Sequence, residues 1–142
     1  MNNERTLNSR DLNRSAHIKN SLSNLIMQAI DELDVNFVGD FHSTAKNSNP
    51  GFESVFSSRY PSPESCLIAN YISAQMGSKV ISFEFAGKIY KGAVEDVCNL
   101  KGVPAVTGEV LSPFALVGKG SDEKSLMQMK SFLSYFGIFF KK

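Results

Sequence analysis

Two titratable residues, His42 and Glu109, each stand at the predicted end of an apolar strand, where a sheet commonly presents side chains to a ligand. His42 precedes the polar pair Ser43-Thr44, a position that suits a metal ligand or a general base. A histidine that only hydrogen-bonds the loop after a strand explains the same position. Asp40, two residues earlier on the same face, could orient the imidazole or be an ordinary acid at a loop end.

Glu109 ends the otherwise apolar segment Val103-Pro104-Ala105-Val106-Thr107-Gly108. A carboxylate beside a buried strand end often has a raised pKa, which suits general acid–base catalysis. A solvated acid at a strand–loop junction is the alternative interpretation.

Near the N-terminus, Asn13 and Arg14 place an amide beside a guanidinium, a pair that can bind a carboxylate through two hydrogen bonds. On the residues alone, a polar N-terminal arm is the favoured interpretation of this segment. His17 is expected at the surface, and Cys66 and Cys98 in the core, as free cysteines usually are. Phosphate-binding glycine loops, CxxC pairs and the G-x-S-x-G nucleophile motif are absent from the sequence.

Composition narrows the classes of function further. The 142 residues include 15 basic and 14 acidic ones, so the net charge of +1 argues against a partner that is a nucleic acid or a membrane surface. Two cysteines are too few for a disulfide scaffold and favour a reducing cytoplasm. No apolar run approaches 18 residues and no signal peptide is recognisable, so no membrane span is expected.

Hydrophobic periodicity predicts the elements that must position these residues. The first half contains a polar arm over 1–15, a helix at about 16–33, a strand at 35–41 and a long loop over 43–61. A second helix starts with Ser62 as N-cap and Pro63 at its first position and ends at Gly77, and a strand follows over 79–85.

The second half is expected to hold a helix at 92–100, a strand at 103–108, a loop over 111–120 and a last helix capped by Ser121 or Asp122 and ended by Gly137. The helices should bury apolar stripes, namely Ile18, Leu22, Leu25, Ile26, Ala29, Ile30 and Leu33 in the first, Leu67, Ile68, Tyr71, Ile72 and Met76 in the second, and Leu126, Met129, Phe132, Leu133 and Phe136 in the last. The alternation predicts one α/β domain over 1–142, with a mainly parallel (mixed) sheet flanked by helices.

Three segments in order resemble a known family. Asp11-Leu12-Asn13-Arg14, Val38-Gly39-Asp40-Phe41-His42-Ser43 and Gly102-Val103-Pro104-Ala105-Val106-Thr107-Gly108-Glu109-Val110 resemble the zinc-dependent deacylases of the succinylglutamate desuccinylase and aspartoacylase family, in the metallocarboxypeptidase superfamily. The resemblance runs from about residue 8 to the end. It implies a zinc-exopeptidase-like fold and a hydrolase that cleaves the amide of an acidic N-acyl amino acid or a related small molecule.

The resemblance also implies residue roles. Asn13 and Arg14 match the pair that holds the substrate carboxylate, and His42 matches the third zinc ligand. Glu109 matches the glutamate that activates the zinc-bound water and shuttles its proton. An upstream arginine is also expected, for which Arg5 and Arg10 are the candidates.

The sequence departs from the family pattern at one point. The His-x-x-Glu motif that supplies the first two zinc ligands has no counterpart before Asn13, although a catalytic zinc ion needs about three protein ligands. The chain is therefore expected to be a truncated, incomplete catalytic domain that holds zinc weakly and is inactive alone. Missing strands would leave a sheet edge open to a second copy of the chain. The alternatives are a non-catalytic carboxylate-binding module and a self-associating remnant. Specificity is assigned to the loops 43–61 and 111–120.

Overall fold

The computed structural model describes residues 6–7, 10–112 and 118–139. The order of elements is β1 (Thr6–Leu7), β2 (Arg10–Asp11), the 3₁₀ helix η1 (Leu12–Arg14), α1 (Leu22–Glu32), β3 (Val38–Thr44), β4 (Ser54–Tyr60), α2 (Glu64–Met76), β5 (Lys79–Phe85), α3 (Val94–Leu100), β6 (Ala105–Leu111) and α4 (Ser121–Tyr135). Among these described parts, no helix combines the length and the apolar content that crossing a membrane requires.

The main sheet has the strand order β3-β6-β4-β5. β3 runs parallel to β6 and β4 runs parallel to β5, but β4 and β6 are antiparallel, so the sheet is mixed. The predicted α/β class with a sheet flanked by helices is confirmed. Within the described residues, β3 and β5 form the two edges of this sheet.

The long loop predicted over 43–61 is wrong in its second half, which forms the central strand β4. The serines of this strand are typical of a loop in the sequence, but Ser54, Ser57 and Ser58 are buried in the fold. Small hydroxyl side chains fit beneath packed helices and find hydrogen-bond partners there. Ser57, for example, contacts the Cys66 thiol of α2.

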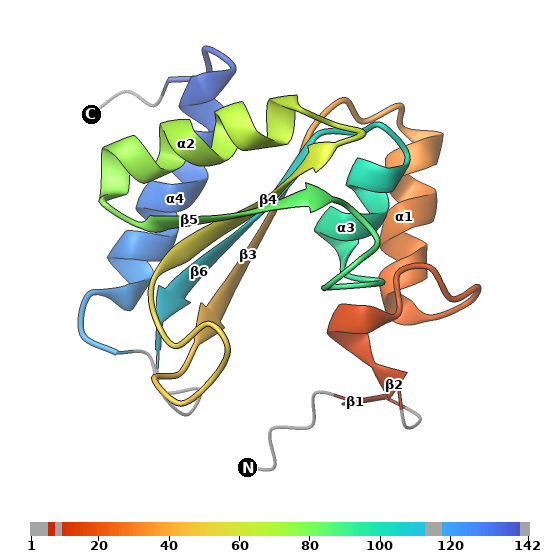
Figure 1. Cartoon of the computed structure of the whole chain (residues 1–142), viewed down its shortest axis with the longest axis horizontal. Coiled ribbons are helices and arrows are strands. Elements are labelled where there is room, and N and C mark those ends of the chain that lie inside the picture. Colours follow the sequence, from red (N-terminus) through yellow and green to blue (C-terminus); the bar gives the residue numbers. More distant parts are fainter. Residues whose placement is uncertain (1–5, 8–9, 113–117, 140–142) are drawn as a thin grey trace.

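Helices cover the two faces of the sheet (Figure 1), with α2 and α4 on one side and α1 and α3 near one end on the other. The first pair buries one cluster against the sheet, consisting of Val55, Ile68, Ala69, Ile72, Val106 and Phe132. The second pair buries a smaller cluster of Ala16, Met27, Ile30, Cys98 and Ala105. Because α3 and α1 cover only part of their face, the rest of that face is left for a cavity.

The first helix begins later than predicted. Residues 16–20 form turns rather than helix, and Asn20 has a positive φ of 64° that a helix cannot contain. Helix α1 starts only after Ser21, whose Oγ accepts a hydrogen bond from the Asn24 backbone N–H. The segment before the helix is tied down, since Ser21 Oγ also donates to the Ser15 carbonyl.

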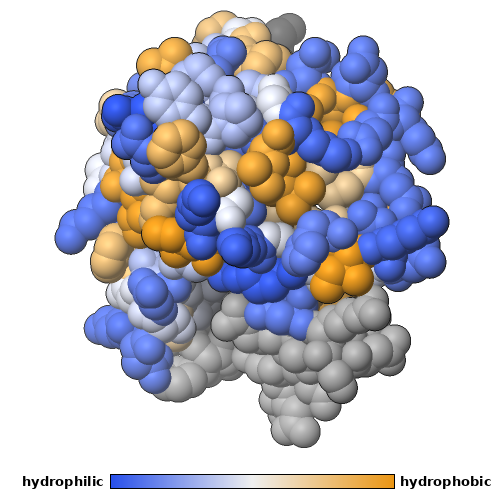
Figure 2. All heavy atoms as spheres, turned by 45° about the vertical axis from the view of Figure 1, so that its right-hand side comes forward, coloured by the Kyte–Doolittle hydropathy of each residue, from blue (hydrophilic) through white to orange (hydrophobic). Residues whose placement is uncertain are grey.

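The predicted apolar stripes are partly wrong. In α1, Leu22, Leu25, Ile26 and Leu33 are exposed, and Figure 2 shows hydrophobic atoms scattered among hydrophilic ones on this side of the molecule. Leu67, Leu126 and Met129 are exposed as well. In α4, Phe132 is buried as predicted, and the other buried positions are the polar residues Ser121, Gln128 and Ser131. Periodicity finds an apolar face, but the neighbour that a helix meets decides which part of that face is covered.

The helix ends follow the glycine predictions better than the cap prediction. Gly77 directly follows α2 and Gly137 follows the C-cap Phe136 of α4, and they adopt positive φ angles of 69° and 76°, as expected for C-terminal glycines. Ser62 does not cap α2, because its hydroxyl donates to the Asn99 carbonyl and the cap position is held by Pro63. Neither Ser121 nor Asp122 is the N-cap of α4, which is Gly120.

Candidate functional site

His42 and Glu109 are direct neighbours across the β3–β6 pair. In the parallel register their Cα positions are partners, and the ring Nδ1 of His42 lies 4.0 Å from Glu109 Oε1. Two residues that the sequence placed at separate strand ends thus lie side by side in one sheet. The predicted strand ends are wrong, since β3 continues to Thr44 and β6 to Leu111. Both side chains therefore project from within rigid strands rather than from loops.

Asp40 holds the other side of the imidazole. His42 Nε2 lies 2.8 Å from Asp40 Oδ1, and the side chains are 27% and 26% exposed. The hydrogen bond to Asp40 raises the pKa of His42 above 6.5, with support from the charges of Asp40 and Glu109. Burial and the charge of Arg14 act in the opposite direction. The imidazole thus lies between two carboxyl groups, an arrangement that can hold a proton and pass it on.

Arg14 and Asn13 reach the site from the 3₁₀ helix η1. Asp11 accepts a hydrogen bond from the Asn13 backbone N–H through its side chain and caps this turn. Arg14 Nη1 donates to the Asn13 carbonyl at 2.6 Å, and its guanidinium carbon lies 4.7 Å from the centre of the Tyr90 ring. These contacts fix a cation at one wall of the site.

The polar-arm interpretation is therefore wrong for the residues that follow Asp11. Ala16 N–H donates to the Gly92 carbonyl at 2.9 Å and ties this segment to the loop before α3. Gly92 is needed at that contact, because a Cβ atom on it would lie 2.3 Å from the Arg14 carbonyl and its φ is +80°. Arg5 and the side chain of Arg10 lie outside the described residues.

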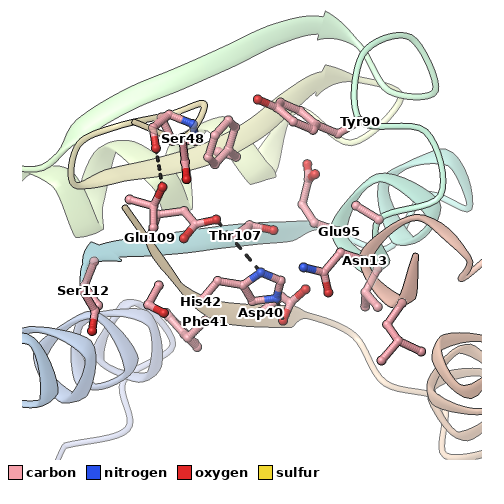
Figure 3. Close-up of a pocket in the computed structure, with 18 of the residues that line it drawn as sticks. Asn13, Asp40, Phe41, His42, Ser48, Tyr90, Glu95, Thr107, Glu109 and Ser112 are labelled. Carbon is pink, nitrogen blue, oxygen red and sulfur yellow. Dashed lines mark hydrogen bonds and ion pairs between the residues drawn. The ribbon is translucent and has the colours of Figure 1, made fainter. Parts of the chain in front are cut away.

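All four site residues predicted from the sequence line one open cavity of about 1290 Å³. Its lining comes from η1, α1, β3, the loop after β3, β4, α3, β6 and the start of α4. In Figure 3 the side chains of Asn13, Asp40 and His42 gather on one side, with Glu109 and Ser48 on another and Glu95 and Tyr90 facing them. Of the specificity loop predicted at 111–120, residues 113–117 lie outside the described residues.

Sequence reasoning missed Glu95, which also lines this cavity. Its side chain is 3% exposed, and its Oε1 accepts hydrogen bonds from Asn99 Nδ2 at 2.6 Å and Ser58 Oγ at 3.5 Å. Burial is the main cause that raises the pKa of Glu95 to about 8, and the neighbouring Asp96 adds to it. The available signal was the Glu95-Asp96 pair at the start of a short helix, which resembles an ordinary favourable charge at a helix N-terminus.

Gly108 lets α4 approach the strand that carries Glu109. A Cβ atom on Gly108 would lie 2.6 Å from Gln128 Oε1 and 2.8 Å from Phe41 Cδ1. The fully buried Gln128 donates from Nε2 to the Glu109 carbonyl at 3.4 Å. The far side of β6 thus steadies the backbone of Glu109.

The donor set does not complete a zinc centre. No group of three His, Cys, Asp or Glu residues within the described ranges is arranged to hold a metal ion, whereas catalytic zinc takes about three protein ligands. His42 alone has the form of a ligand, since Asp40 binds one ring nitrogen, as carboxylates do for metal-binding histidines. His17, the second histidine of the chain, is exposed on the turn before α1. Within the described ranges, these residues therefore do not fit a catalytic zinc ion.

Comparison of the sequence with known proteins does not assign this chain to a family. No protein-family model matches this chain. No curated protein matches its sequence either.

Proposed function

We propose that the cavity binds the carboxylate of a small N-acyl amino acid and that the chain belongs to a hydrolase of the succinylglutamate desuccinylase and aspartoacylase type. The observation that supports this proposal is convergence: Asn13, Arg14, His42 and Glu109, far apart in sequence, line one cavity. Three motifs that resemble the family in sequence order thus supply groups that can act on one molecule.

Arg14 is the anchor in this proposal. Its guanidinium carries a permanent charge and is held by Tyr90 and by the Asn13 carbonyl, so little side-chain freedom is lost when a carboxylate binds. The Asn13 amide can add a further hydrogen bond to the ligand. Neither contact of Arg14 involves His42 or Glu109, so ligand binding and chemistry can be tested by separate substitutions.

Glu109 is the base in the proposed reaction. It accepts a proton from water as the water oxygen attacks the amide carbonyl carbon, and it returns that proton to the leaving nitrogen when the C–N bond breaks. The products are a carboxylic acid and the free amino acid. The imidazole of His42, hydrogen-bonded to Asp40, lies 4.0 Å from Glu109 Oε1, so the proposed base has a group beside it that can also carry a proton.

The test is a comparison of binding and turnover. We expect N-acetyl amino acids to bind the wild-type chain and to bind more weakly by about tenfold or more after Arg14→Gln, because a charged hydrogen-bonded pair is lost. Glu109→Gln should keep binding and abolish any release of the free amino acid. Unchanged binding by Arg14→Gln would contradict the proposal.

Metal supply is a separate arm of the same experiment. Turnover is measured with the chain alone, with added Zn²⁺ and with a chelator, and zinc retained after dialysis is counted. The zinc ion that the family resemblance implies would need two ligands besides His42. Tightly held stoichiometric zinc would contradict the incomplete donor set described above.

A non-catalytic carboxylate-binding module is the second candidate. It is favoured by the contacts that hold Arg14, which are made by Tyr90 and the Asn13 carbonyl rather than by His42 or Glu109. Under this alternative, no amino acid is released under any metal condition, and Glu109→Gln leaves affinity unchanged.

A further inference from the structure

We propose that Glu95 forms a subsite for a protonated amine, so that the preferred ligand carries an ammonium group on its side chain as well as the carboxylate that Arg14 binds. This inference rests on the proposed function and specifies its substrate class. It replaces the acidic side chain that the family resemblance suggests with a basic one.

The charges around the cavity support a cationic side chain. Among the described lining residues, Asp40, Glu95, Glu109 and Asp122 are acids, whereas Arg14 and His42 are the basic side chains. A second carboxylate on the ligand would enter a cavity in which acids already outnumber bases. An ammonium group would instead meet opposite charge.

Glu95 is fixed in place, as a recognition group should be. Its Oε1 is bound by Asn99, and Asn99 is itself fully buried and bonded through Nδ2 to the Ala105 carbonyl and through Oδ1 to the Ala105 N–H. Ser65 also donates to Asn99 Oδ1 at 2.5 Å. This network joins α2, α3 and β6, so the carboxyl group is presented with little freedom to move.

The second oxygen of Glu95 is the one available to a ligand. Both hydrogen bonds that the described residues make to this carboxyl group end on Oε1. The side chain projects from α3 into the cavity opposite the Asp40–His42 pair (Figure 3). Among the described residues, Oε2 is not one of the buried side-chain atoms that lack a partner, so this oxygen is open to the cavity and can meet a ligand there.

Ligand binding should also release a proton. Beside burial, the charges of Asp96 on its own helix and Asp40 on β3 raise the pKa of Glu95, whereas the hydrogen bonds from Asn99 and Ser58 lower it. The Cys98 thiol on the same helix also lies within reach of its charge. With a pKa of about 8, the empty site holds Glu95 mostly protonated at pH 7. An ammonium group at hydrogen-bond distance favours the ionised form and expels that proton to the buffer.

The experiment measures binding by isothermal titration calorimetry at pH 7 in two buffers of different ionisation enthalpy. The ligands are Nα-acetylornithine and Nα-acetyllysine, their uncharged counterparts N-acetylnorvaline and N-acetylnorleucine, and N-acetylglutamate. We expect the better of the two amines to bind about tenfold or more tightly than its uncharged counterpart. Close to one proton should be released per amine bound and none per uncharged analogue.

Glu95→Gln is the decisive variant, because glutamine keeps the shape and the Oε1 acceptor of the protonated acid. It should erase the preference for the amines and the proton release while leaving N-acetylnorleucine binding unchanged. Asp122→Asn is the matched control, since Asp122 is exposed and lines the same cavity. It should reduce the preference by less than about threefold, as expected for a solvent-screened charge.

The outcomes separate this inference from the proposed function. Equal binding of charged and uncharged ligands, tighter binding of N-acetylglutamate, or an unchanged amine preference in Glu95→Gln would refute the ammonium subsite and leave the carboxylate site standing. If none of the ligands binds, or if Arg14→Gln binds all of them as the wild type does, the proposed function and the subsite fail together.

Discussion

Replacing Glu95 by glutamine should stabilise the fold, and the gain should grow with pH. The carboxyl group has a pKa of about 8 in the folded chain against an ordinary value of 4.5, because it is buried. Between these two values the unfolded chain releases a proton that the folded chain retains, so wild-type stability falls as the pH rises. This cost is absent at low pH and complete above the folded pKa.

The size of the effect follows from the same two values. A pH of 7 lies 2.5 units above the ordinary pKa of 4.5 that the carboxyl group has in the unfolded chain. At roughly 1.4 kcal/mol per unit, keeping the proton in the fold lowers the free energy of unfolding by about 3 kcal/mol. The penalty should reach about 4 kcal/mol at pH 8. Glutamine preserves the hydrogen bonds from Asn99 and Ser58 but cannot ionise.

The assay is urea unfolding followed by far-ultraviolet circular dichroism at several pH values from 5 to 8, since the chain contains no tryptophan. The difference in unfolding free energy between Glu95→Gln and wild type should widen by about 3 kcal/mol over this range. Taking a difference cancels the other titrating groups. Glu84→Gln, at an exposed position of β5, should follow the wild type. Parallel curves for Glu95→Gln and wild type would refute the reasoning.

Three further predictions concern the site and the sheet. Gly108→Ala should destabilise the chain by about 1–3 kcal/mol in urea unfolding, because its Cβ would overlap Gln128 and Phe41; a cost that stays the same in a Gln128→Ala background would contradict this cause. Asp40→Asn should lower the pKa of His42, followed through its imidazole proton signals by NMR, since the hydrogen bond to Asp40 is what chiefly raises it. Because the pKa of His42 is raised in the fold, the stability that its protonation contributes is complete below pH 6.5 and is lost as the pH rises through the folded pKa. If His42 titrates in Asp40→Asn as it does in the wild type, the hydrogen bond to Asp40 is not the cause of the raised pKa. Finally, self-association through an open edge of the sheet, formed by β3 or by β5 in the described part of the chain, stays a prediction. Sedimentation velocity should show dimers at high concentration, and a monomer at every concentration would count against it.

Local sequence signals predicted several features correctly for identifiable physical reasons. Gly77 and Gly137 end helices because a positive φ is inexpensive for glycine and costly for other residues. Strand β5 was found with its bounds, since Val80, Ile81, Phe83 and Phe85 are typical strand formers. His42 and Glu109 were both placed at the ends of apolar strands, and in the parallel β3–β6 pair they are direct neighbours. Both residues lie within the strands rather than beyond them.

Features that depend on distant partners were missed. In β4 the strand formers Val55, Phe56 and Tyr60 are diluted by three serines, so the local strand signal is weak. Its place in the centre of the sheet depends on β5 and β6, which supply its hydrogen bonds. The exposed leucines of α1 fit a helical stripe, but α1 packs on α3 rather than across the sheet. Met27 and Ile30 are therefore the hydrophobic residues of that helix that are buried against apolar neighbours. The role of Glu95 depends on burial, which spacing along one short helix does not reveal.

The sequence by itself determined the α/β class and most C-terminal helix ends, because these follow from side-chain chemistry and short-range periodicity. It also singled out four residues that line one cavity. Tertiary structure alone decided the antiparallel β4–β6 pairing, the docking of the Asn13–Arg14 turn onto the Tyr90 loop and the buried state of Glu95. The physical reason is that strand pairing, burial and charge are set by groups far away in the chain. The local sequence pattern around a residue does not show which distant groups will pack against it.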